Sequence, residues 1–183
     1  MFQVLMNLCE KQKYACIYAN LAERTKFIFG QITAVNEDEV AIRMLTPNGE
    51  EDGIVAKQVT DIIRLETDCR YAESMIKLSN TIKKQLKMYP LQQEHIFFSL
   101  LTFAQKNRRV VSIEILNSGL DDIVGFIEQC SEEICTVLQV DQYGREDGYS
   151  FVALSDITQI SCDSEEERRT FILWQLETGG GAD

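Results

Sequence analysis

The chain contains one stretch of sequence written twice. When residues 1–83 are laid on residues 96–178 without a gap, about 15 positions are identical, where roughly five are expected from average composition. Repetition at a constant spacing predicts two domains of the same fold. We therefore expect a first unit at 1–89, a second at 90–178 and a flexible tail at 179–183. The identical pairs include Phe2/Phe97, Leu5/Leu100, Leu21/Leu116, Gly30/Gly125, Asp61/Asp156 and Asp68/Asp163, together with the Glu-Asp-Gly triplets at 51–53 and 146–148.

Each copy predicts a helix, five short strands and a second helix. The strand-like segments are rich in β-branched residues and separated by turn residues, a pattern typical of antiparallel hairpins. Gly30 and Gly125 lie inside the second strand, where glycine marks a bend or a close backbone approach, and a small barrel needs such a bend to close. We expect strands near 14–20, 26–35, 39–45, 54–58 and 61–66 in the first copy, and near 110–115, 122–130, 134–140, 149–153 and 156–161 in the second.

In each copy, the second helix is preceded by residues that commonly begin a helix. Asp68 is suited to cap a helix over 69–89. In the second copy Ser164 and Glu167 form a capping box, and Gly179-Gly180-Gly181 ends the helix.

This layout resembles the Sm-like small β-barrel, on the order of elements and the glycine in strand two. The resemblance implies a tandem pair of five-stranded barrels flanked by helices, and single-stranded RNA as the ligand of the family. The family's RNA-reading residues do not carry over. Val35 and Glu39 stand at those positions in one copy, and Cys130 and Ile134 in the other; Ile63-Arg64 and Thr158-Gln159 replace its Arg-Gly pair.

Charge and cysteine content narrow the function classes. The net charge is −11, and all of the excess lies in the second half: residues 1–90 hold 12 basic and 12 acidic side chains, and residues 91–183 hold 6 and 17. This acidic half is either a solvated surface or one that meets a cationic partner. Six cysteines without a Cys-x-x-Cys pair favour free thiols in the cytoplasm. No segment reads as a signal peptide or a membrane span.

No motif for catalysis, metal or cofactor stands out, and we expect a protein that is not an enzyme. The acidic turn Glu50–Asp52 is interpreted as a solvated hairpin tip, with ion binding as the alternative. The single histidine, His95, lacks a partner pattern for nucleophilic chemistry.

Two functions remain. The first is a non-enzymatic binding or scaffolding module for another protein or for a second copy. The second is an RNA-binding protein that uses a basic seam between the repeats, which the acidic pI of about 4.6 disfavours. The candidate binding residues for either are Lys83, Lys84, Lys87, Lys106, Arg108 and Arg109.

Overall fold

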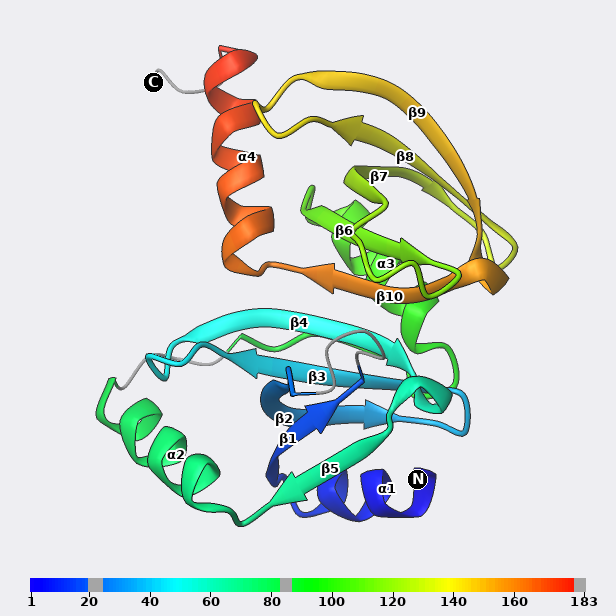
Figure 1. The fold of residues 1–183 in the computed structure, drawn as a ribbon. Coiled ribbons are helices and arrows are strands. Elements are labelled where there is room, and N and C mark those ends of the chain that lie inside the picture. Colours follow the sequence, from blue (N-terminus) through cyan, green and yellow to red (C-terminus); the bar gives the residue numbers. More distant parts are fainter. Residues whose placement is uncertain (20–24, 83–86, 180–183) are drawn as a thin grey trace. The chain divides into compact units, whose positions relative to one another are not determined.

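The computed structural model describes residues 1–19, 25–82 and 87–179. Its contacts divide the chain into two compact units, Met1–Ile96 and Phe97–Asp183 (Figure 1). Both units are mixtures of helix and antiparallel sheet. Of the expected tail, residues 180–183 lie outside the described part of the chain.

The first unit is one antiparallel sheet of five strands with helices before and after it. The strand order is β5-β1-β2-β3-β4, so that the first strand lies between the second and the fifth. A short 3-10 helix, η1 (Val59–Asp61), joins the last two strands. The elements are α1 (Phe2–Glu10), β1 (Tyr14–Tyr18), β2 (Ile28–Val35), β3 (Glu39–Leu45), β4 (Glu51–Gln58), β5 (Arg64–Thr67) and α2 (Arg70–Ile82).

The second unit has the same order of elements along the chain and across its sheet. Its strands follow the order β10-β6-β7-β8-β9. The 3-10 helix η2 (Leu154–Asp156) occupies the place of η1. The elements are α3 (Ile96–Lys106), β6 (Val110–Ile115), β7 (Ile123–Cys130), β8 (Ile134–Val140), β9 (Glu146–Ala153), β10 (Ile157–Cys162) and α4 (Glu165–Glu177).

Neither five-stranded sheet closes on itself, which corrects the expectation of closed barrels. The fourth and fifth strands stand at opposite ends of each order, and within the described residues no ladder joins β4 to β5 or β9 to β10. Closure of a barrel requires such a ladder between the two ends of the sheet.

The ladders also correct the gapless superposition of the two halves. Ala15 pairs with Gly30 in the first unit, and Val111 pairs with Gly125 in the second. Ala15 therefore corresponds to Val111, although the gapless superposition matches it with Val110. The strands that follow keep the expected correspondence, so the one-residue difference falls in the connection after the first strand.

The opening helices show the same one-residue shift. A residue with positive φ follows each helix, at Gln12 (51°) and at Arg108 (48°). On this correspondence Leu5 matches Leu101, and both are fully buried. The identities of Phe2 with Phe97 and of Leu5 with Leu100 are therefore coincidental.

Gly30 and Gly125 permit a close approach of neighbouring strands, as the sequence predicted. A Cβ atom at Gly30 would lie 2.7 Å from Cγ2 of Ile42 and against the carbonyl oxygen of Arg43. A Cβ at Gly125 would lie 2.8 Å from the carbonyl carbon of Leu138. Only glycine fits a gap this narrow, so both positions are structural requirements.

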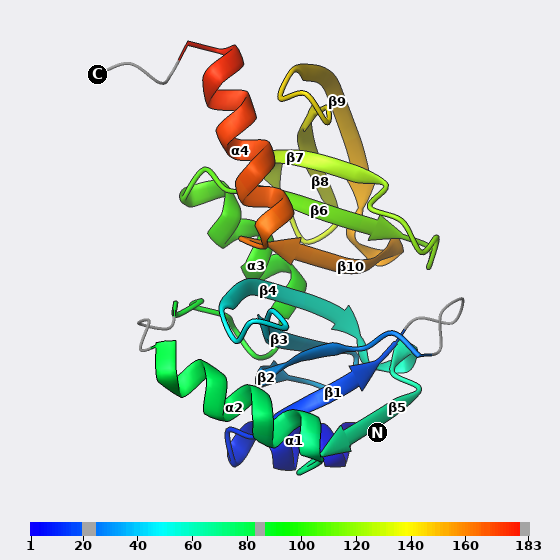
Figure 2. The same cartoon turned by 60° about the vertical axis from the view of Figure 1, so that its left-hand side comes forward.

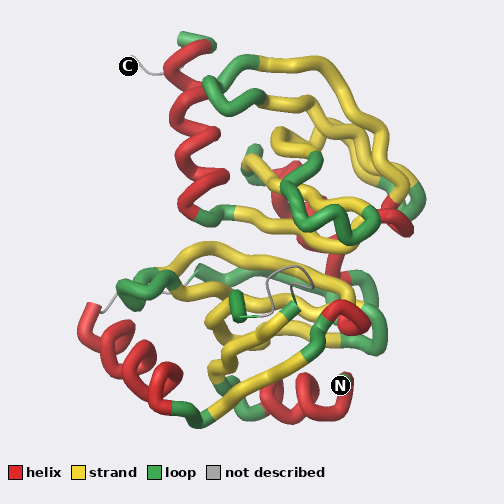
Figure 3. The backbone as a smooth tube through the Cα atoms, viewed as in Figure 1, coloured by secondary structure: helices red, strands yellow, loops and turns green. Residues whose placement is uncertain are grey.

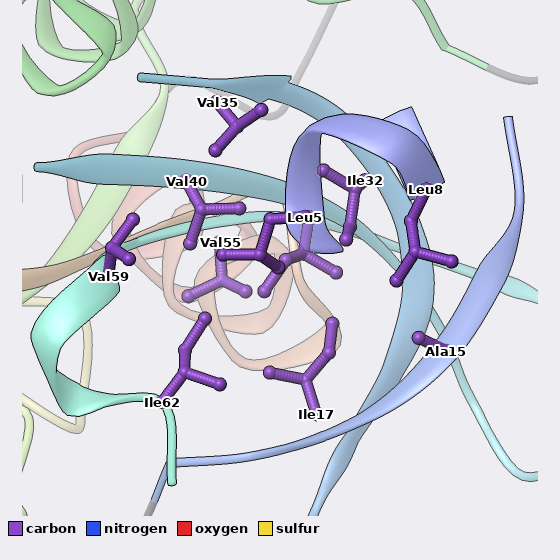
Figure 4. Close-up of a cluster of buried hydrophobic side chains, with 11 residues drawn as sticks. Leu5, Leu8, Ala15, Ile17, Ile32, Val35, Val40, Val55, Val59 and Ile62 are labelled. Atoms are coloured by element: carbon purple, nitrogen blue, oxygen red, sulfur yellow. The ribbon is translucent and has the colours of Figure 1, made fainter. Parts of the chain in front are cut away.

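Successive side chains along a strand point to opposite faces of the sheet, so they pack in two separate cores. In the first unit Ala15 and Ile17 point towards α1, whereas Cys16 and Tyr18 point towards α2. Figure 4 shows the core beneath α1, which contains Leu5, Leu8, Ala15, Ile17, Ile32, Val35, Val40, Ile42, Val55, Val59 and Ile62. Each sheet thus has an opening helix on one face and a closing helix on the other (Figure 2).

The two closing helices begin differently. Ser164 and Glu167 form the predicted capping box of α4. Asp68, by contrast, does not cap α2: it has a φ of 53°, and its carboxylate accepts a hydrogen bond of 2.7 Å from Lys13 Nζ. The helix starts two residues later, with the Glu73 N–H donating to the Cys69 carbonyl. Among the described residues, no helix is long and apolar enough to cross a bilayer.

Candidate binding surface on strand β9

Strand β9 ends the sheet order of the second unit and carries two exposed aromatic side chains. Tyr149 is 60% exposed and Phe151 is 75% exposed. The ladder with β8 sets Tyr149 opposite Leu138 and Phe151 opposite Thr136. In the part of the chain that the structure describes, β8 is the only strand paired with β9 (Figure 3).

The backbone of the same two residues faces away from the sheet. Amide groups alternate in direction along an antiparallel strand. The Leu154 N–H donates to the Glu133 carbonyl at 2.9 Å, which sets this alternation. The amides of Val152 and Ser150 therefore point towards β8, and those of Phe151 and Tyr149 point outwards.

A third apolar side chain extends the exposed aromatic pair. Ile134, the first residue of β8, is 51% exposed and lies opposite Ala153. Ala153 shares a face of β9 with Phe151, because residues two apart point the same way. We call Ile134, Tyr149 and Phe151 the β9 surface.

Exposed carboxylates stand at both ends of the β9 surface. Glu146 and Asp147 begin β9 and are exposed. Glu132 and Glu133 are exposed in the turn before Ile134, and Glu133 is tied to the end of β9 through its carbonyl. A ligand that spans the surface would meet negative charge at each end.

The start of β9 is anchored to α4. Asp141 Oδ1 accepts hydrogen bonds from the N–H groups of Tyr143 (2.8 Å) and Arg145 (2.9 Å), which orders the β8–β9 turn. A Cβ atom on Gly144 would lie 2.6 Å from the backbone nitrogen of Trp174, so this turn contacts α4 directly. Trp174 Nε1 donates to Glu146 Oε1 at 3.1 Å. These contacts hold the first residues of β9 in place against α4.

Two of the predicted basic residues are engaged within the second unit. Arg108 forms an ion pair of 2.9 Å with Glu128, and its guanidinium lies 4.9 Å from the centre of the Phe126 ring. Arg109 Nε lies 3.6 Å from the buried carboxylate of Asp163. Both guanidinium groups thus already have anionic or aromatic neighbours.

The remaining predicted cations are lysines. Lys87 belongs to the first unit and is exposed, and its backbone N–H donates to the Glu51 carboxylate at 3.0 Å. Lys106 is exposed at the end of α3, in the second unit. Lys83 and Lys84 lie outside the described residues.

The other candidate positions have local partners. The acidic turn contributes the Glu51 carboxylate to the Lys87 backbone. His95 is exposed, and its N–H donates to the Gln92 carbonyl at 3.2 Å. Across the described ranges, no group of three or more His, Cys, Asp or Glu side chains is placed to hold a metal ion.

The carboxyl group of Glu167 is deeply buried, and its hydrogen bonds offset that burial. Glu167 of α4 accepts from Ser112 Oγ at 2.7 Å, from Ser161 Oγ at 3.3 Å and from the Ser164 N–H at 2.7 Å. Burial raises the pKa of Glu167, and these hydrogen bonds act in the opposite direction. We assign this group to helix capping.

Comparison with protein-family models, with curated proteins and with solved structures finds no match for this chain.

Proposed function

We propose that this protein is a non-enzymatic binding module that holds an extended, basic segment of another protein along β9. The segment adds as a further strand, so that its main chain pairs with the outward amides of Tyr149 and Phe151. Addition of a strand to an exposed sheet edge is a common mode of peptide recognition.

The observation that carries this proposal is that the outward amides and the exposed aromatic rings belong to the same two residues. Natural edge strands are commonly protected by lysine, by proline or by a covering loop. The outward-facing residues of β9 are instead Tyr149 and Phe151. Aromatic residues that meet an added strand supply large buried area at low entropic cost.

Charge complementarity selects the kind of segment. The carboxylates at the two ends of the β9 surface favour lysine or arginine at both ends of the ligand. The centre of the ligand should be β-branched or aromatic, because it lies against Tyr149 and Phe151. The acidic second half of the chain then attracts this partner over a longer distance.

The shared strand order of the two units, and the glycine in the second strand of each, support our proposal of a duplicated Sm-like fold. The equivalent positions of the first unit hold Ile54 and Ala56, opposite Arg43 and Ala41. None of the six cysteines forms a disulfide, which supports a reducing compartment such as the cytoplasm.

The test is selection from a phage-displayed library of random short peptides on the full chain. We expect enriched sequences to have an apolar centre with basic ends. The variant Tyr149→Ile with Phe151→Ala installs the first unit's residues and should weaken binding of an enriched peptide at least about tenfold, which corresponds to about 1.4 kcal/mol. Hydrogen exchange should show the amides of Tyr149 and Phe151 protected by the bound peptide.

The matched control is Leu116→Ala with Leu120→Ala, which removes exposed apolar surface from the β6–β7 loop and should leave binding unchanged. Equal binding by the β9 variant, or protection elsewhere, would refute the proposal. If the chain instead binds oligouridine, and if salt abolishes this binding but the β9 variant does not, the protein is an RNA-binding protein. Concentration-dependent dimers lost in the β9 variant would make a second copy the partner.

A further inference from the structure

Two cysteines face each other across the β7–β8 hairpin of the second unit. Cys130 is the last residue of β7, and Cys135 is the second residue of β8. The ladder pairs them directly with each other. Cys135 is fully buried, and Cys130 is half-buried, so a small solute has access to only one of the two thiols.

The register places this pair where side chains approach most closely. The Ser131 N–H donates to the Ile134 carbonyl at 2.9 Å, so Ser131 and Ile134 form a hydrogen-bonded pair. Hydrogen-bonded and non-hydrogen-bonded pairs alternate along an antiparallel ladder. Cys130 and Cys135 therefore form a non-hydrogen-bonded pair, for which the Cα atoms lie about 4.5 Å apart.

That separation suits a disulfide. The Cα atoms of disulfide-bonded cysteines usually lie about 4.4 to 6.8 Å apart. The hairpin turn of Ser131, Glu132 and Glu133 holds the two strands in register, with Ser131 Oγ accepting the Ile134 N–H at 3.0 Å. A bond between the two sulfurs needs no change of strand pairing.

From this geometry we propose that Cys130 and Cys135 form a redox site that hydroperoxides convert reversibly into a cross-strand disulfide. No other function of the chain is required for this proposal, and it is independent of the β9 surface.

The chemistry divides the two thiols into an attacking and a resolving group. The Cys130 thiolate attacks hydrogen peroxide, an S–O bond forms, the O–O bond breaks and hydroxide leaves, which gives a sulfenic acid. The Cys135 sulfur then displaces the sulfenic oxygen, which leaves as water with the Cys135 proton. Two thiols thus transfer two electrons to one peroxide and yield one disulfide and two waters.

The electrostatics agree with this division. The neighbouring Cys135 thiol lowers the pKa of Cys130, and its interaction with Cys130 together with burial raises the pKa of Cys135. A thiolate is the nucleophile in such reactions, and the half-buried Cys130 is the group that becomes one.

The first unit supplies a natural control. Val35 and Val40 form the corresponding ladder pair, in the same position beside the turn. The replacement of Cys130 and Cys135 by valine therefore installs a pair that this fold already accepts. A second pair of thiols, Cys16 and Cys69, also interacts. These two residues are not ladder partners, because Cys16 lies in β1 opposite Glu66 and Cys69 precedes α2.

The experiment is titration of the folded full chain with hydrogen peroxide, then alkylation and peptide mass spectrometry. The protease Glu-C cuts after Glu132 and Glu133, so the two cysteines fall on separate peptides unless a disulfide joins them. We expect two of the six thiols to be lost together, with these two peptides linked and released by dithiothreitol.

Two control variants test whether the linkage depends on this pair. The Cys130→Val, Cys135→Val variant should lose no pair of thiols at the same dose, and its circular dichroism should match that of the wild type. Cys69→Ala should leave the linked peptides unchanged. Linkage of Cys16 to Cys69 instead, dimers between chains, or irreversible oxidation of Cys130 before any linkage would each overturn the proposal.

Discussion

Gly125→Ala should be among the most destabilising single substitutions in the second unit. The added methyl would lie 2.8 Å from the Leu138 carbonyl carbon and 2.9 Å from the Gln139 Cα, where ordinary contact begins at 3.4 Å. All three nearest atoms belong to the backbone of β8, so no side chain can rotate away. The strands β7 and β8 must separate locally instead.

The cost follows from that separation. Overpacking of a tight interior typically costs about 1 to 3 kcal/mol, and each weakened ladder hydrogen bond adds about 1 kcal/mol. The entropic gain of alanine over glycine in the unfolded chain offsets at most about 1 kcal/mol. We therefore expect Gly125→Ala to lower the free energy of unfolding by about 3 kcal/mol, and the melting temperature of a unit this size by about 12 °C or more.

Urea denaturation followed by tryptophan fluorescence measures this loss. The protein has a single tryptophan, Trp174, whose ring centre lies 4.7 Å from that of Phe126 in the second unit. The control is Gly148→Ala: its φ is 77°, but no atom lies within 4 Å of the new methyl, so strain alone should cost about 1 kcal/mol. A Gly125→Ala chain as stable as the Gly148→Ala chain would refute the close-approach argument.

Two further predictions concern pH and oxidation. Because the pKa of Glu167 is raised above its ordinary value of 4.5, the folded state binds the carboxyl proton of Glu167 more tightly than the unfolded chain does. Its contribution to the free energy of unfolding is thus fully present below pH 4.5 and falls as the pH rises through the folded-state pKa. Glu167→Gln keeps the capping box and should flatten this dependence in urea titrations across the acidic range, whereas an unchanged slope would assign it to other groups. Oxidation that closes the short Cys130–Cys135 loop should raise the free energy of unfolding by about 2 kcal/mol, measured as a higher urea midpoint that dithiothreitol reverses; a lower midpoint would mean that the bond distorts the hairpin.

Local signals in the sequence predicted the elements that depend on one or two residues. Gly30 and Gly125 marked the close approach of strands, and Ser164 with Glu167 marked the start of α4. These signals are reliable because backbone geometry and hydrogen bonding near the residue determine them. Asp68 was misinterpreted because Lys13, far away in the sequence, binds its carboxylate in the fold.

The alignment of the two halves failed for a different reason. In the gapless superposition Leu5 matches Leu100, whereas in the fold it matches Leu101. Helix α3 is apolar on nearly every side and has leucine at both positions, so the sequence match favours the wrong one. The ladder register distinguishes them, but a sequence pattern on a uniformly apolar helix does not.

The candidate site could not be found from sequence because it depends on sheet order. The sequence predicts the segment Tyr149–Ala153 as a strand, but its pattern does not show that β9 ends the order or that its aromatic side chains are exposed. The charge of the basic residues predicts a binding role that does not take their partners in the fold into account. In the fold Arg108 and Arg109 turn out to be placed beside Glu128 and Asp163.

The first unit also tests whether ladder position alone creates the redox site. Val35→Cys with Val40→Cys, introduced into the Cys130→Val, Cys135→Val chain, places two thiols at the equivalent non-hydrogen-bonded pair. Val35 is only 1% exposed, whereas Cys130 is half-buried, so peroxide reaches the transplanted thiol less readily. We expect a disulfide to form between the two introduced cysteines, but more slowly than the Cys130–Cys135 bond forms in the wild type. The rate is measured by counting free thiols at intervals after peroxide is added. If no bond forms, register is insufficient and the surroundings of Cys130 are essential; if it forms faster, exposure of the attacking thiol does not control the rate.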